Sequence, residues 1–133
     1  MPRSDFAWVN FDHNFTAATP TATRTFQVDS PPVLASPDDA NRNGQAVGYV
    51  LVQALDVENS GGAPESQHRI QINAVDLPAF DLPVESGAWQ TWMDRIPPEV
   101  LNAGNNRLTI VHGGGDGDGF RVANVAVHWR EQG

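Results

Sequence analysis

The sequence predicts an all-β protein, an antiparallel two-sheet β-sandwich of seven or eight strands that forms a single domain over residues 1–133. Three observations support this fold class. Apolar and polar residues alternate over short segments. The 10 prolines and 12 glycines are spread along the chain and separate these segments. No segment of about 12 residues or more has the apolar period of 3.6 residues that is typical of a helix.

Three strands are expected in the first half of the chain. Residues 6–11 have apolar side chains at both odd and even positions, and therefore on both faces of the strand. A loop or exposed edge strand rich in Thr and Ala follows, and then residues 24–28 alternate, with Phe26 and Val28 pointing inward. Residues 46–57 are apolar on both faces, which favours a central strand over an edge strand.

The next strand is expected at residues 68–77. The polar segment 59–67 is interpreted as a turn that pairs this strand with residues 46–57 as a hairpin. Three apolar residues of the strand at 68–77 are expected on one face: Ile70, Ile72 and Ala74.

A long irregular connection is expected after residue 76, and it carries Trp89 and Trp92. If the chain is extended there, their spacing points them to opposite faces, so one can lie in the core and the other in solvent. Residues 95–101 favour a single helical turn, because proline is tolerated at a helix start and Glu99 suits its first turn. Residues 102–106 predict a turn with glycine at positive φ.

The last two strands are expected at residues 107–112 and 120–129. Leu108 and Ile110 should point inward from the first of them. In the second, the alternating apolar residues occupy even positions up to Val122 and odd positions from Val125 on. A β-bulge at Ala123 and Asn124 is the simplest account of this change. The intervening GGGDGDG segment is expected to be a loop.

Composition excludes several kinds of chemistry. The chain has no cysteine, which excludes disulfides, thiolate catalysis and cysteine-based metal sites. Its eight cations are all arginine, so there is no lysine for Schiff-base chemistry. The net charge of −8 argues against a nucleic-acid partner. The N-terminal residues do not resemble a secretory signal, no apolar run is long enough to cross a membrane, and the compartment stays open.

Short motifs in residues 46–129 resemble a known family. Ile72 and Asn73 are followed by Leu77, and then by a Gly104-Asn105-Asn106 turn that leads into the strand of Leu108. Together with Trp92, Ile96-Pro97, Leu101, Ile110 and the closing NVAVHW, they resemble galactose-binding-domain-like sandwiches of jelly-roll type, above all carbohydrate-binding modules and the sugar-binding domains of glycosidases. The resemblance implies glycan binding by loops or a concave face. The family often has a calcium-binding acid where this chain has Asn124.

The candidate ligand-binding residues are Trp89, Trp92, Asp94 and Arg95. Proteins bind sugars with an exposed aromatic ring, which meets the C–H face, and with polar groups that meet the hydroxyls. Gln90 adds an amide to this set. The alternative is that both tryptophans lie in the core or wrap the edge of the sandwich; Trp8 and Trp129, on the terminal strands, are expected in the core.

No catalytic or metal site is predicted. Asp39, Asn41 and Asn43 match the start of a calcium loop, but Val50 stands where the bidentate Glu belongs. Asp116 and Asp118 occur in one copy of a glycine–aspartate motif that needs stacked copies. Asp81 and Glu85 are interpreted as solvated loop acids and not as a glycosidase pair. Four histidines, at positions 13, 68, 112 and 128, are expected at the surface or in cross-strand packing; His112 and His128 are placed on neighbouring strands.

The sequence therefore predicts a non-catalytic binding module, with carbohydrate as the expected ligand, and not an enzyme. The alternative is a structural or assembly subunit of a larger complex or homo-oligomer without a small-molecule ligand. No cofactor is predicted, and calcium is the open alternative. A glycan or a protein is the expected partner, with no nucleic acid and no membrane.

Overall fold

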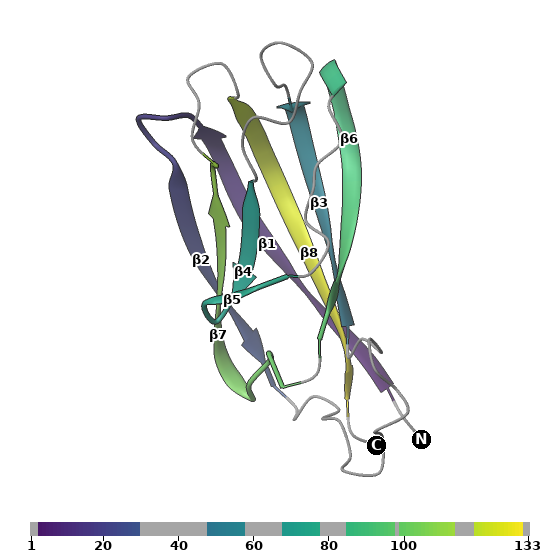
Figure 1. Ribbon diagram of the computed structural model, residues 1–133. Coiled ribbons are helices and arrows are strands. Elements are labelled where there is room, and N and C mark those ends of the chain that lie inside the picture. The colour runs from purple at the N-terminus through teal and green to yellow at the C-terminus, as the bar shows by residue number, and fades with distance from the viewer. Residues whose placement is uncertain are drawn as a thin grey trace.

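The protein is a sandwich of two antiparallel sheets (Figure 1). The structure, a computed structural model, describes residues 3–29, 48–57, 68–77, 85–97, 99–113 and 119–131, in which no helix occurs. The strands are β1 (Arg3–Phe15), β2 (Thr21–Val28), β3 (Gly48–Val57), β4 (Arg69–Ile72), β5 (Val75–Asp76), β6 (Glu85–Ile96), β7 (Gly104–Val111) and β8 (Phe120–Glu131). The predicted fold class is confirmed.

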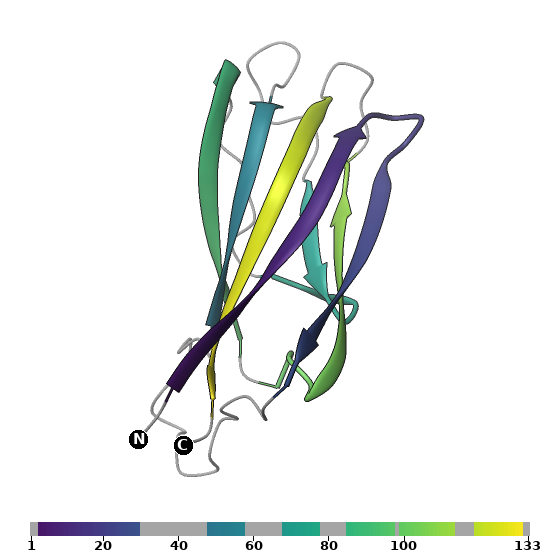
Figure 2. The ribbon, with the colours of Figure 1, turned by 180° about the vertical axis from the view of Figure 1, so that it is seen from behind.

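Among the described residues, each sheet has four strands. The order is β1-β8-β3-β6 in the first, which we call sheet A, and β2-β7-β4-β5 in the second, sheet B. In Figure 2 the long strands of sheet A lie side by side, nearest to the viewer. As predicted, β3 is a central strand, because it pairs with both β6 and β8.

The core lies between the sheets and follows the alternation of each strand. Sheet A contributes Val50, Val52 and Ala54 from β3, all fully buried. Sheet B contributes the predicted pairs, which are also buried: Phe26 and Val28, Ile70 and Ile72, and Leu108 and Ile110. Burying such aliphatic side chains stabilises the fold by roughly 1.5–3 kcal/mol for each.

The predicted hairpin of β3 and β4 is wrong, because the two strands belong to different sheets. β4 pairs with β7, with Ile70 opposite Ile110 and Ile72 opposite Leu108. Cross-strand apolar pairs of this kind choose a strand's neighbour, and alternation within one strand does not reveal them.

Strand β4 also ends earlier than predicted. Asn73 and Ala74 have φ of 52° and 67° and form the tight turn between β4 and β5. Both central residues of a type I′ turn need positive φ. Ala74 is therefore exposed in a turn and does not continue the buried face.

Two predictions for residues 76–101 are also wrong. Trp89 and Trp92 lie on β6, which pairs with β3 from Glu85 opposite Val57 to Ile96 opposite Gly48. The hydrogen-bonding edge of β3 makes this segment a strand, although its own apolar period is weak. The expected helical turn is absent from the described residues 95–97 and 99–101, and Glu99 has φ of 70°, outside the right-handed helical region.

The predicted β-bulge in β8 is confirmed. Val52 and Ala54, two residues apart on β3, oppose Val125 and Val122, which are three apart on β8. The neighbouring strand β1 also shifts register, between Asn10 and His13.

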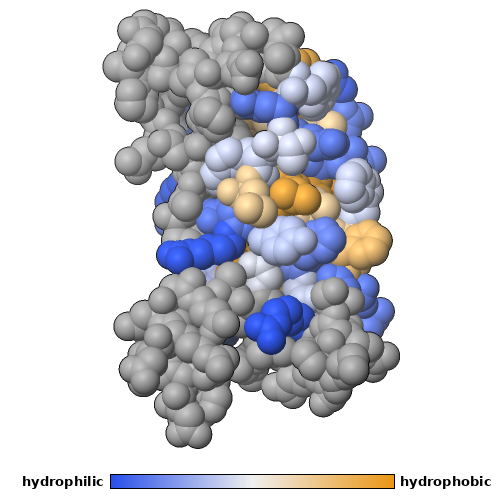
Figure 3. All heavy atoms as spheres, turned by 90° about the vertical axis from the view of Figure 1, so that its right-hand side faces the viewer, coloured by the Kyte–Doolittle hydropathy of each residue, from blue (hydrophilic) through white to orange (hydrophobic). Residues whose placement is uncertain are grey.

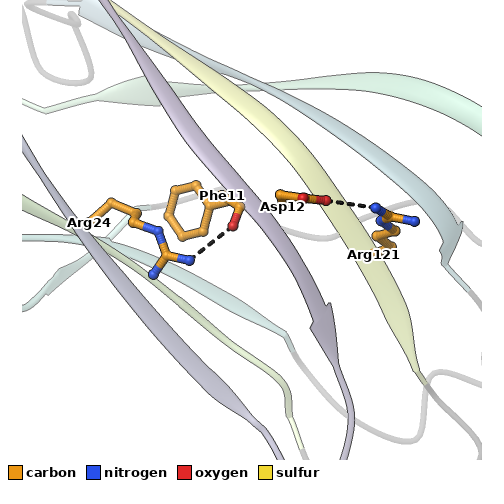
Figure 4. Close-up of polar contacts among 4 residues, drawn as sticks. All are labelled: Phe11, Asp12, Arg24 and Arg121. Atoms are coloured by element: carbon orange, nitrogen blue, oxygen red, sulfur yellow. Dashed lines mark hydrogen bonds and ion pairs between the residues drawn. The ribbon is translucent and has the colours of Figure 1, made fainter.

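Two arginines act near the irregularity in β1 (Figure 4). Arg121 makes an ion pair of 2.6 Å with Asp12, whose φ is 40°. From sheet B, Arg24 donates to the Phe11 carbonyl at 2.9 Å, and its guanidinium lies 5.2 Å from the centre of the Phe11 ring. Arg24 thus ties the edge of sheet B to that of sheet A.

The part of the chain that the structure describes contains no helix that is both long and apolar enough to cross a membrane.

Candidate functional site

Strand β6 divides the four predicted ligand residues between two faces. Trp89 lies on the outer face of sheet A with 51% of its surface exposed. Trp92 is opposite Val52, on the core side, and packs against the core. As predicted, the two tryptophans point to opposite faces.

Asp94 and Arg95 separate in the same way. Asp94 lies opposite the buried Val50 and is only 3% exposed, and its Oδ1 accepts a hydrogen bond of 2.7 Å from the Arg95 amide. The Arg95 side chain is exposed on the outer face. It stands six residues from Trp89, or roughly 20 Å along a strand. Of the four, only Trp89 and Arg95 can meet a ligand on the outer face, and they do so at different places.

Trp89 lines a pocket on the outer face of sheet A. Its volume is about 410 Å³, and its lining includes Gln53 of β3, Trp89, Gln90 and Thr91 of β6, and Ala123 of β8. Ligand pockets in proteins range from about 300 to 1,000 Å³. Ala123, a small side chain at the bulge in β8, lines the same pocket as the indole, and the alternation of β3 and β6 turns Gln53 and Thr91 to the same face as Trp89.

Sequence reasoning missed Gln53, Thr91 and Ala123. Alternation along the strand is the signal that could have found them, because a residue between two core-facing residues points to the outer face. Gln53, for example, falls between Val52 and Ala54, which face the core. Which strands lie beside β6, however, follows only from the sheet order.

The outer face of sheet A carries further exposed aromatic residues. Trp8 was expected in the core, and that is wrong, because it is 60% exposed. Its neighbour Val9 is buried instead, so β1 turns its even-numbered residues outward. Trp129, in contrast, is 2% exposed, as expected. On the side of the molecule that includes β6, apolar side chains interrupt the hydrophilic surface at mid-height (Figure 3).

The histidines fall into separate environments. His112 follows β7 in sheet B and His128 lies on β8 in sheet A, so the expectation that they share neighbouring strands is wrong. His112 lies beside His68, with ring centroids 5.1 Å apart, and both are buried. Nδ1 of His68 accepts a hydrogen bond of 3.0 Å from the Gly113 amide, which makes this pair part of the core packing.

No group of three or more metal-binding side chains occurs among the described residues. The two calcium candidates, at residues 39–43 and 116–118, lie outside the described part of the chain, as do Asp81 and the side chain of Glu85.

The fold and the site together define a β-sandwich with an aromatic, pocketed outer face. The chain belongs to a family described as "Family of unknown function (DUF7383)", whose profile matches residues 4–131. None of the curated proteins matches it. Among solved structures it is similar to part of the dimeric latent PorU from Porphyromonas gingivalis, with 12% identity and a TM-score of 0.65 over 98% of this chain. The chain spans 13% of that protein, and the likeness shows the fold alone.

Proposed function

We propose that the protein is a non-catalytic binding module that holds a carbohydrate in the Trp89 pocket. The observation that carries this proposal is a half-exposed indole in a pocket of about 410 Å³ that also includes one side-chain amide and one hydroxyl on the same face of the sheet. A sugar ring has an apolar C–H face that stacks on an indole, and hydroxyls that exchange hydrogen bonds with amide groups. Gln53 supplies an amide and Thr91 a hydroxyl, both on the same face of the sheet as the indole.

The pocket chemistry favours a neutral sugar and binding without reaction. The described lining residues are uncharged, and none is a carboxylate or a histidine. A glycosidase needs two carboxyl groups about 5–10 Å apart across the scissile bond. The proposal agrees with the galactose-binding-domain-like modules that the sequence resembles, although the pocket lies on an outer sheet face and not on the end loops.

The test is a glycan array with the purified chain, followed by calorimetric titration of any sugar that binds. Trp89→Ala should weaken binding by at least about tenfold, which corresponds to 1.4 kcal/mol. Trp8→Ala is the matched control, since it removes an equally exposed tryptophan from the same face but outside the pocket. No binding by the wild type, or equal losses in both variants, would refute the proposal.

The second candidate function, an assembly subunit, is favoured by a different observation. Phe6, Trp8, Tyr49 and Met93 are between 40% and 60% exposed on the face of sheet A. They do not line the Trp89 pocket, and exposed apolar groups of this extent are typical of contacts between proteins.

A further inference from the structure

The outer faces of the two sheets differ in character. On sheet B the outward side chains of β2 and β7 are mainly polar, and Thr23 and Thr109 share a hydrogen bond of 2.9 Å between their hydroxyls. Sheet A carries five of the six large hydrophobic residues that are exposed in the described part of the chain: Phe6, Trp8, Tyr49, Trp89 and Met93. A sheet face in contact with water is normally polar. The outer face of sheet A therefore has the character of a covered surface.

The strand registers arrange this surface in two rows across all four strands. The first row runs Phe6, His128, Tyr49, Arg95. Its rings stack, with centroids 5.5 Å apart for Phe6 and His128 and 4.7 Å for Tyr49 and His128. The second row runs Trp8, Ala126, Leu51, Met93. We call these eight residues the double row.

The size of the surface suits a protein partner. At the roughly 150–250 Å² of a large side chain, the four exposed residues of the double row, Phe6, Trp8, Tyr49 and Met93, present roughly 400 Å². A stable interface buries about 800 Å² on each partner, including a polar rim. Leu51, His128 and Arg95 lie in the same two rows and extend the surface toward that size.

The charges on this face favour a second copy. Copies with a net charge of −8 repel each other, so they approach best over a face with few acids. Three arginines point outward from sheet A: Arg95, Arg121 and Arg130. Among the residues of this sheet whose side chains the structure describes, the outward acid is Asp12, which is paired with Arg121. Aromatic residues, Met and Arg, with few acids, are also the composition that is enriched in protein interfaces.

We propose that two copies of this chain form a dimer through the double row, with the two-fold axis parallel to the strands and between β8 and β3. Such an axis places β1 over the partner's β6 and β8 over the partner's β3. Each row therefore lies against the same row of the partner, with its residues in the opposite order. Trp8 then faces the partner's Met93, and the partner's Leu51 lies over Ala126, a small side chain that is already 5% exposed in the single chain. Arg95 faces the partner's Phe6.

These contacts are chemically matched. A thioether packs well on an indole, and a guanidinium packs on an aromatic ring. Facing sheets lie about 10 Å apart and cross at about 30°, so they diverge away from the axis. Trp89 is four residues from Met93, or roughly 13 Å along β6, toward the diverging corner of the face. The proposed dimer gives a specific form to the second candidate function, an assembly subunit, and does not rest on glycan binding.

The test is sedimentation velocity over about a hundredfold range of protein concentration, at low and high salt. The wild type should form a dimer that tightens with salt, as screening weakens the repulsion between acidic copies. Trp8→Arg and Met93→Glu should each weaken the dimer by at least about tenfold. The double variant should recover it, because each new Arg would face the partner's new Glu. Thr25→Arg, on the exposed face of sheet B, is the control and should leave the dimer unchanged.

A wild type that stays monomeric under all these conditions would overturn the proposal. So would a dimer that neither single variant weakens. If both single variants dissociate and the double variant does not recover, the two-fold along the strands is wrong. Circular dichroism confirms folding in each case, and the 60% exposure of Trp8 and Met93 makes them tolerant positions. Glycan binding that is lost in Trp89→Ala while the dimer persists would separate the two functions.

Discussion

Replacing Asn106 by Ala tests how the turn before β7 is held. Asn106 is fully buried, and its amide joins three segments. Its Oδ1 accepts from the Asn102 amide and from Nδ2 of Asn73, both at 2.8 Å. Its Nδ2 donates to the carbonyls of Asn102, at 2.8 Å, and Gly104, at 3.1 Å. The side chain thus satisfies backbone groups that the turn leaves without ladder partners.

The expected loss follows from these four bonds. Each contributes about 1 kcal/mol, and a buried group left without a partner costs about 1–3 kcal/mol. Asn106→Ala should therefore lower the free energy of unfolding by about 3–5 kcal/mol, out of the 5–15 kcal/mol that is typical of a domain. Urea unfolding at a fixed slope measures this as a lower midpoint.

Asn105→Ala is the matched control. Asn105 is the adjacent residue, but it is exposed, and its side chain bonds only with that of Gln27 among the described contacts. Its loss should stay below about 1 kcal/mol. If Asn106→Ala costs less than about 1 kcal/mol, or no more than Asn105→Ala, the buried amide does not hold the turn and the reasoning fails.

Three further substitutions have defined outcomes in thermal or urea unfolding. Gly48→Ala should destabilise by about 3 kcal/mol or prevent folding, because its Cβ would lie 2.0 Å from the His128 carbonyl oxygen; near-wild-type stability would contradict this packing. Trp92→Ala should lower the free energy of unfolding by about 2–4 kcal/mol, because core contacts are lost, whereas Trp89→Ala should change it by no more than about 0.5 kcal/mol. Equal losses in the two variants would argue against the assigned faces. Ala74→Gly should stabilise by about 0.5–1 kcal/mol, because its φ of 67° strains an alanine, and a loss instead would argue against this turn.

The local patterns of the sequence were sufficient for much of the fold. Alternation predicted the inward pairs of β2 and β7, and the change of parity in residues 120–129 predicted the bulge in β8. Apolar residues on both faces of residues 46–57 predicted a central strand. Each of these inferences depends only on the two-residue period of a strand, which is a property of the chain itself.

Only part of the candidate site could be predicted from the sequence. The three-residue spacing of Trp89 and Trp92 required opposite faces on a strand, but it did not say which of the two is exposed. The pocket brings Gln53 and Ala123 to Trp89 from two other strands, 36 residues before it and 34 after it. No spacing within one segment encodes such a meeting.

The sequence by itself determined that the chain forms strands, where most of them lie, and which residues of β2, β3 and β7 can face a core. The tertiary structure alone decided that β3 and β4 separate into different sheets, that residues 85–96 become a strand against β3, and that Trp8 faces outward. The physical reason is that periodicity reports the two faces of a strand, whereas its neighbours and its covered face depend on pairing with residues far away in the chain.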